Sequence, residues 1–252
     1  MLYKYVGANN GKQALEVLKY FCEAYTLKAS EPTSFNDPFE FKIVADFEAD
    51  EATIRRRFFE HKKDASEAEY ESWRRHHTKD EWWVTQETRK ELLSRFGVLC
   101  LSEVGDNHLM WSHYASQHQG FCVGFDETAL ARLEGIIGQG PVRYQVDAPM
   151  FRYYFDPPEL LEKQVFACKS KLWKYEREYR IVFNRSGTVG FPKAALKQII
   201  IGCRAYMELR AYADHHCEKA EIEFFQMCED FRAYRLRKEV VRKNVTIMSS
   251  FF

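Results

Sequence analysis

The sequence predicts a single domain of the α+β class, in which short strands are interrupted by helices. Its 252 residues, 46% of them hydrophobic, are enough to build one sizeable core. Apolar stretches of strand length, such as 98–101 and 196–202, are separated by segments with helical spacing. Strands and helices do not alternate regularly along the chain, which argues against a Rossmann sheet or a barrel.

The first part of the chain is expected to begin with a strand and to carry a helical insertion. The pattern predicts a strand at 1–6, a helix at 12–25, an extended segment at 26–31, a turn-rich loop at 32–38 and an alternating strand at 39–47. Residues 50–96 are dense in charged side chains, lack Gly and Pro, and show helical spacing. We therefore interpret residues of about 50–96 as a helical insertion within one domain spanning 1–252.

The second part of the chain is expected to return to short strands. The predicted elements are a buried strand at 97–102, a helix at 109–116, strands at 120–126 and 142–146, a helix at 157–173, a strand at 178–183, a turn at 187–191, a buried strand at 196–202, a helix at 207–218, and strands at 221–227 and 231–236. Asp126 stands where a helix cap would be.

Composition indicates a soluble cytoplasmic protein. Acidic and basic residues balance at 37 each, so no overall field favours nucleic acid or an anionic membrane. The seven cysteines form no CxxC pair, which is typical of a reducing compartment. The amino terminus has no apolar signal core, and no segment has the length and apolar character to cross a bilayer. We expect no membrane contact.

The segment 171–183 carries the strongest chemical pattern, because Glu176 and Glu178 are two residues apart at the start of a predicted strand. In an extended segment such residues point to the same face, where two like charges are unfavourable unless they are compensated. The candidates for compensation are Lys171, Lys174, Arg177 and Arg180. A ligand is the other possibility, and a solvated strand edge over Trp173 and Tyr175 is the structural alternative.

Two further segments combine turn or aromatic residues with polar groups. Tyr3, Lys4 and Tyr5 lie on the first strand, where the tyrosines either pack in the core or line a pocket for a planar ring. Asn36 and Asp37 precede a proline, which predicts a shaped turn or a polar group held beside a site.

The helix predicted at 109–116 has an unusual run of side chains. Trp111, Ser112, His113 and Tyr114 follow one another, and Trp111 shares a face with Tyr114 as His113 does with Gln117. Both a packing role and a functional role are open. His113 and His118 lack a third ligand of suitable spacing, so no metal site is expected. The chain has no phosphate-binding glycine motif and no nucleophile elbow.

As a set, five motifs resemble a widespread bacterial family described as a domain of unknown function. The motifs are FNDPFE (35–40), LCLSE (99–103), MWSHYA (110–115), GFCVGFD (120–126) and WKYEREYRIV (173–182). They extend over most of the chain outside the helical insertion.

The order of these motifs is also similar to that of ADP-ribosyltransferases, most closely the toxin branch that modifies nucleic acid. This resemblance implies a mostly antiparallel split sheet and NAD as substrate. Tyr3, Lys4 or Tyr5 would hold the nicotinamide ribose, and a late glutamate would assist transfer. Ser102, Trp111, Ser112 and Tyr114 would pack on the nicotinamide, Glu178 is the preferred glutamate with Glu176 next, and Arg180, Lys174 or His113 would contact the pyrophosphate. The chain lacks a first-strand His or Arg and a Ser-Thr-Ser run.

The function implied by this resemblance is an ADP-ribosylating effector, such as a toxin or an anti-phage component. Its partners would be NAD, a nucleic-acid or protein acceptor, and an antitoxin protein. One alternative is a catalytically inert module of the same fold that binds a nucleotide or a partner. Another is a nucleic-acid-cleaving enzyme that uses His113 with Glu176 or Glu178 as acid and base.

Overall fold

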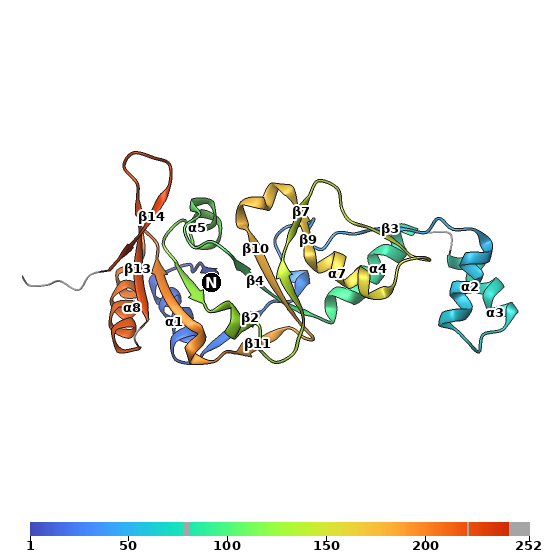
Figure 1. The fold of residues 1–252 in the computed structure, drawn as a ribbon, viewed down its shortest axis with the longest axis horizontal. Coiled ribbons are helices and arrows are strands. Elements are labelled where there is room, and N and C mark those ends of the chain that lie inside the picture. The colour runs from blue at the N-terminus through green and yellow to red at the C-terminus, as the bar shows by residue number, and fades with distance from the viewer. Residues whose placement is uncertain (78–80, 221, 242–252) are drawn as a thin grey trace, which may run out of the picture.

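An eight-stranded, mostly antiparallel sheet organises residues 1–77, 81–220 and 222–241, which are those that the computed structural model describes (Figure 1). In spatial order its strands are β14 (Leu236–Val240), β13 (Glu223–Glu229), β12 (Leu196–Ile201), β5 (Phe121–Phe125), β1 (Leu2–Val6), β4 (Gly97–Ser102), β10 (Glu178–Phe183) and β6 (Ile136–Pro141). Only β12 and β13 are parallel neighbours within this sheet. The chain therefore has a mixed helix and strand fold built on this sheet.

Helices and short strand pairs surround the sheet. The helices are α1 (Gly11–Cys22), α2 (Glu51–His61), α3 (Glu67–His77), α4 (Glu81–Ser94), α5 (His108–Tyr114), α6 (Glu127–Leu130), α7 (Pro158–Ala167) and α8 (Met207–Ala220), with 3-10 turns η1 (Pro32–Ser34), η2 (Lys171–Glu176) and η3 (Lys193–Ala195). The remaining strands pair as β2 (Thr26–Ala29) with β11 (Gly187–Gly190), β3 (Val44–Asp46) with β8 (Met150–Arg152), and β7 (Arg143–Gln145) with β9 (Cys168–Ser170). Across the described residues, every helix is too short or too polar to pass through a lipid bilayer.

Alternating side chains give the sheet two buried faces. Phe121 and Val123 of β5 face α1 and α8 in the largest apolar cluster, whereas Cys122 between them faces the cluster under α5. Ile200 of β12 joins Cys122 on the α5 face. The α5 face also carries the polar groups described below.

Side-chain caps fix where several helices begin. The carboxylate of Asp126 accepts a hydrogen bond from Ala129 N, as the sequence predicts, and begins α6. Asn107 accepts from Leu109 N and caps α5. The amide group of Asn107 also donates to the Tyr175 carbonyl at 3.0 Å, so this cap ties α5 to the segment that carries the two glutamates.

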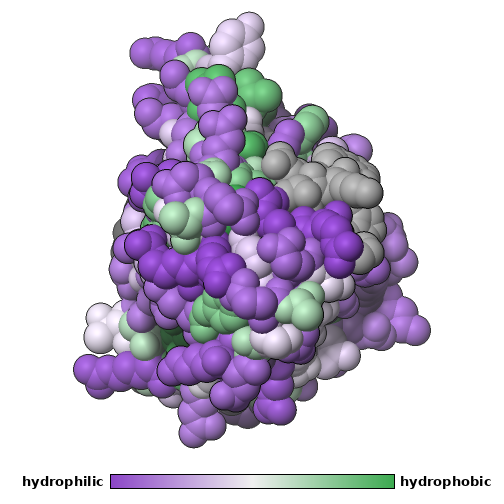
Figure 2. Space-filling view, turned by 90° about the vertical axis from the view of Figure 1, so that its right-hand side faces the viewer, coloured by the Kyte–Doolittle hydropathy of each residue, from purple (hydrophilic) through white to green (hydrophobic). Residues whose placement is uncertain are grey.

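The segment interpreted as a helical insertion holds α2, α3 and α4, which differ in their packing. Ile54 and Phe58 of α2 pack with Tyr70 of α3 in a separate small cluster, and the pair lies at the far end of the molecule from α8 (Figure 1). That end presents a mainly hydrophilic surface (Figure 2). Leu92 of α4 instead packs in a second apolar cluster beside the sheet.

β1 and β4 meet through one residue pair, Tyr3 with Ser102. All other neighbouring strands of the large sheet are registered over at least four residue pairs. Where the two strands separate, the Cys100 carbonyl has no partner on β1, and the ammonium of Lys4 donates to it at 3.0 Å. The separation opens the sheet beside the continuous pairing of β4 with β10, and a cavity lined by residues of both strands occupies this place.

Several predicted elements near the amino-terminal half differ from the structure. The strand predicted at 39–47 is only Val44–Asp46, because the Asp37 turn continues through Phe41, whose φ is +57°. Phe41 is buried against Phe35 and Phe166 instead of alternating along a strand.

Differences in the carboxyl-terminal half reflect tertiary pairing. The helix predicted at 157–173 ends at Ala167, since Cys168–Ser170 pairs with β7. The turn predicted at 187–191 contains β11, paired with β2, and the strand predicted at 231–236 begins only at Leu236. β6 was missed because Gly138, Gly140 and Pro141 disfavour a strand locally.

The close approach of β5 to β1 predicts a strong effect of a single methyl group. A Cβ at Gly120 would lie 2.1 Å from the Val6 carbonyl oxygen, whereas a Cβ at Gly138 would meet nothing within 4 Å. We expect Gly120→Ala to lower the free energy of unfolding by about 2 kcal/mol or more, as overpacking does. Gly138→Ala, the control, should change it by less than about 0.5 kcal/mol. Urea titration measures both, and equal effects would contradict this packing.

Candidate functional site

Three adjacent strands bring the main motifs into one row. Tyr3 of β1 pairs with Ser102 of β4, and Ser102 pairs with Glu178 of β10. Residues paired across neighbouring strands project from the same face of a sheet. The first-strand, hydroxyl and glutamate motifs, although far apart in the sequence, therefore lie side by side on the α5 face.

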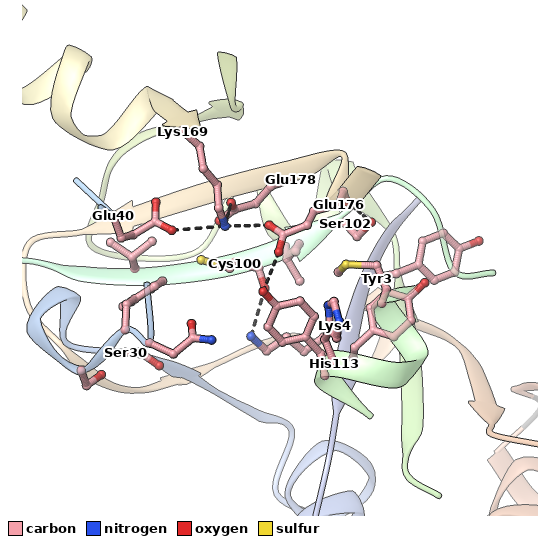
Figure 3. Close-up of a pocket in the computed structure, with 18 residues that line it drawn as sticks. Tyr3, Lys4, Ser30, Glu40, Cys100, Ser102, His113, Lys169, Glu176 and Glu178 are labelled. Carbon is pink, nitrogen blue, oxygen red and sulfur yellow. Dashed lines mark hydrogen bonds and ion pairs between the residues drawn. The ribbon is translucent and has the colours of Figure 1, made fainter. Parts of the chain in front are cut away.

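A cavity of about 380 Å³ opens beside this row (Figure 3). The predicted residues that line it are Tyr3, Lys4, Tyr5, Asn36, Ser102, His113, Tyr114, Glu176 and Glu178. Glu40 and Lys169, for which the sequence analysis assigned no role, line it as well. Strands β1, β4, β9 and β10, helix α5 and the turn after η1 thus all contribute to one site.

Glu176 and Glu178 do not lie in one extended segment, contrary to the prediction. Glu176 ends the 3-10 turn η2, and Arg177 follows in the left-handed conformation with φ +44°. Glu178 then begins β10. Both carboxylates are nevertheless buried and contact the same cation.

The shared cation is Lys169 of β9, whose ammonium lies among three carboxylates (Figure 3). Its Nζ is 2.6 Å from Glu176 Oε2, 3.0 Å from Glu178 Oε2 and 3.2 Å from Glu40 Oε2. Burial alone would lower the pKa of Lys169, but the three carboxylates raise it above its ordinary value. Lys169 therefore stays charged and compensates the glutamates, in place of Lys171, Lys174 and Arg177.

Arg180 is the second compensating cation, and it is 2% exposed. Its Nε donates to Glu178 Oε1 at 2.7 Å, its Nη1 donates to the Phe166 carbonyl at 3.0 Å, and its Nη2 donates to Glu40. Each of the three guanidinium nitrogens therefore donates a hydrogen bond to another residue of the chain. The guanidinium of Arg180 lies beneath the carboxylates and is not among the described residues that line the cavity, so the structure does not place it for the expected contact with a pyrophosphate.

The two neighbouring glutamates have opposite pKa shifts. Burial would raise the pKa of Glu178, but Arg180 and Lys169 lower it to about 2. Burial raises the pKa of Glu176, and Lys169 and Tyr114 only partly oppose this. Glu178 is thus a fixed negative charge at neutral pH, whereas Glu176 is the carboxylate that takes up a proton more readily.

Tyr114 and His113 of α5 form the aromatic side of the site. The Tyr114 hydroxyl donates to Glu176 Oε1 at 2.5 Å, and burial together with Glu176 raises the pKa of this phenol. The His113 ring is exposed, and its Nδ1 lies 3.0 Å from the Tyr175 hydroxyl. His113 lines the cavity but hydrogen-bonds to Tyr175 and to no glutamate among the described residues.

Three of the other predicted binding residues are not among the described residues that line the cavity. Trp111 is fully buried, packs edge-on against Tyr5 and donates from Nε1 to the Gly105 carbonyl. Asp37 accepts a 2.6 Å hydrogen bond from Trp173 Nε1, which fastens the turn containing Asn36 to η2. Ser112, the third, is half-buried on α5. The core encloses the indole of Trp111, so the structure does not place this ring for the expected packing on a bound nicotinamide.

Polar groups of the row also hold the backbone. The Ser102 hydroxyl donates to the Glu176 carbonyl at 2.6 Å and accepts from Val104 N. The Tyr144 hydroxyl accepts from Glu178 N at 2.7 Å. Tyr5 donates to the Val104 carbonyl. These bonds fix the backbone at both glutamates, so the carboxylates are held in place from the main chain outward.

Sequence reasoning missed Glu40 and Lys169 for different reasons. Glu40 ends the FNDPFE motif and was placed on a strand, where it would be solvated, but the Asp37 turn directs it inward. Lys169 lies in the segment predicted as helix, and only the pairing of β9 with β7 places it opposite the glutamates. A lone lysine between Cys168 and Ser170 gives no sequence signal for such a role.

The fold and the site define a mixed helix and strand protein with a buried charge network beside a cavity. A family model described as a protein of unknown function (DUF2971) matches residues 110–181. This range contains Tyr114, Lys169, Glu176 and Glu178, and it leaves the FNDPFE and LCLSE motifs outside. Neither the curated proteins nor the solved structures include a significant match to the chain.

Replacing Lys169 tests the charge network. We expect Lys169→Met to lower the free energy of unfolding by about 3 kcal/mol or more at pH 8, because it leaves three buried carboxylates with one cation. The loss should shrink as the pH falls to 5, since the folded variant then binds protons on those carboxylates. Lys171→Met, at an exposed lysine two residues on, is the control. Denaturant titrations at both pH values measure this, and a loss independent of pH would contradict the network.

The acid stability of the fold should follow the lowered pKa of Glu178. Its folded pKa of about 2 lies below the ordinary 4.5, so its contribution is complete above pH 4.5 and is lost as the pH falls towards 2. We expect a decrease on the order of 3 kcal/mol in the free energy of unfolding across this window. Glu178→Gln should flatten the decrease. The pKa of Glu176 is raised instead, so its contribution to stability is lost as the pH rises above 4.5. An unchanged slope in the variant would refute the assignment.

Proposed function

We propose that this protein is an NAD-dependent ADP-ribosyltransferase whose reaction takes place in the cavity beside Tyr3, Ser102 and Glu178. The observation that carries the proposal is their alignment across three adjacent strands. The resemblance to ADP-ribosyltransferases requires a first-strand residue, a hydroxyl motif and a late glutamate to surround one nicotinamide riboside. A single row on one face of the sheet meets that requirement.

The charge of the cavity suits the positively charged nicotinamide ring of NAD. Glu40, Glu176 and Glu178 carry three negative charges, and Lys169 and Arg180 carry two positive ones, so the network has one net negative charge. The rings of Tyr3 and Tyr114 also line the cavity, and aromatic faces attract a cation. The nicotinamide is neutral once released, so the site favours the cationic substrate over this product.

The two glutamates divide the chemistry in this proposal. The bond between ribose and nicotinamide breaks with its electron pair leaving on the ring nitrogen, and Glu178, ionised and rigid, stabilises the oxocarbenium-like sugar. A hydroxyl or amine of the acceptor then bonds to the sugar carbon. Its proton passes to Glu176, whose raised pKa suits proton transfer and whose Oε1 is oriented by Tyr114.

The inert binding module and the nucleic-acid-cleaving enzyme are the rival proposals. A module that only binds has no need for neighbouring carboxylates with opposite pKa shifts, which favours an enzyme. A cleaving enzyme would need His113 to act with a glutamate, but the ring bonds to Tyr175. The transferase is therefore the function that the geometry supports best.

The proposal is tested by incubating the protein with labelled NAD and a panel of protein, RNA and DNA acceptors. We expect the wild type to release nicotinamide and label an acceptor. Glu178→Gln and Glu176→Gln should each reduce the rate by about a hundredfold or more, as loss of one stabilising or proton-transferring group does. Expression of the wild type, but not of Glu178→Gln, should slow growth of the host.

Glu16→Gln, at an exposed residue of α1, is the matched control and should keep full activity. Thermal melting establishes that each variant is folded. Binding of NAD without nicotinamide release would instead indicate the binding module, and cleavage of RNA or DNA without NAD would indicate the nuclease. Either result would overturn the transferase proposal.

A further inference from the structure

The cavity has a second polar side that the acidic network does not use. Lys4 reaches it from β1, and Ser30 and Asn36 reach it from the segments on either side of η1. In Figure 3, Ser30 lies across the cavity from Lys169. The ligand that fills the cavity therefore meets carboxylates on one side and a different set of groups on the other.

Lys4 is a cation without a counter-ion on this side. Its ammonium donates to the Cys100 carbonyl at 3.0 Å and forms no ion pair with any other described residue. An ammonium has three donors, so two remain for a ligand. The side chains of Ser30 and Asn36 likewise make no hydrogen bond within the described part of the chain, which leaves a hydroxyl and an amide facing the cavity.

The position of Lys4 follows from the separation of β1 and β4. If the two strands were paired along their whole length, the Cys100 carbonyl would accept a hydrogen bond from β1. Because they pair only at Tyr3 and Ser102, the ammonium of Lys4 donates to this carbonyl instead. The bond to Cys100 instead holds the ammonium at the cavity wall. A cation so positioned, in a cavity that Ser30 and Asn36 also line, is suited to an anion.

We propose that Lys4, Ser30 and Asn36 bind the diphosphate of the dinucleotide. This inference rests on the proposed function and deepens it, because it assigns the two sides of the cavity to the two charged parts of NAD. The acidic side receives the nicotinamide cation, and the Lys4 side receives the anionic diphosphate. Lys4 then takes the role expected for Arg180, Lys174 or His113. The guanidinium of Arg180 is enclosed by Glu178 and Glu40.

Calorimetric titration with NAD, inorganic pyrophosphate and nicotinamide riboside tests this assignment. We expect Lys4→Gln to weaken the binding of NAD and of pyrophosphate by about tenfold or more, because the variant lacks one charge-assisted hydrogen bond. Nicotinamide riboside, which carries the cation but no diphosphate, should bind the variant as it binds the wild type. Higher salt should weaken pyrophosphate binding to the wild type more than to the variant.

Two further variants separate charge from folding. Lys4→Arg keeps the charge and should retain most of the affinity for pyrophosphate. Lys12→Gln, at an exposed lysine of α1, should bind all three ligands normally. Equal weakening of nicotinamide riboside by Lys4→Gln, or unchanged NAD affinity, would overturn the subsite while leaving the transferase proposal in place. Binding of pyrophosphate without any binding of NAD would refute the proposed function and leave an anion site.

Discussion

The buried contact of Lys169 and Arg180 with three glutamates is the interaction on which the site depends. Glu40, Glu176 and Glu178 come from three different segments, and none could remain buried as an anion without these cations. Removing one partner from such a network leaves an uncompensated charge. The network therefore fixes the turn after η1, the end of η2 and the start of β10 relative to β9, and it makes the cavity wall rigid.

The separation of β1 from β4 provides the space for a ligand, which the charge network by itself does not provide. A fully paired sheet would fill this place with backbone hydrogen bonds. Pairing only at Tyr3 and Ser102 keeps the strands together and opens a gap beside the carboxylates. Lys4 stabilises the open arrangement through the Cys100 carbonyl. The cavity thus has an acidic side and a basic side, and this polarity is the physical basis of both proposals made above.

Glu176 and Glu178 are close in the sequence, but their different surroundings shift their pKa values in opposite directions. Glu178 contacts both cations, and its pKa falls, whereas Glu176 contacts Lys169 and a neutral phenol, and its pKa rises. The left-handed Arg177 separates the 3-10 turn that ends at Glu176 from the strand that begins at Glu178. The two carboxylates share Lys169, but their second partners differ: Tyr114 for Glu176 and Arg180 for Glu178. An extended strand would have given both carboxylates the same surroundings.

The sequence alone determined the α+β class, most helices, the central strands and half of the lining residues, because apolar periodicity and polar motifs are local signals. It also indicated that Glu176 and Glu178 require compensation. Only the tertiary structure decided which cations provide it. Lys169 and Glu40 reach the site through strand pairing and a turn that no local pattern encodes, and Trp111 and Arg180 are taken out of the cavity by packing. Long-range contacts choose the partners of a buried charge, so this part of the site could not be deduced from spacing.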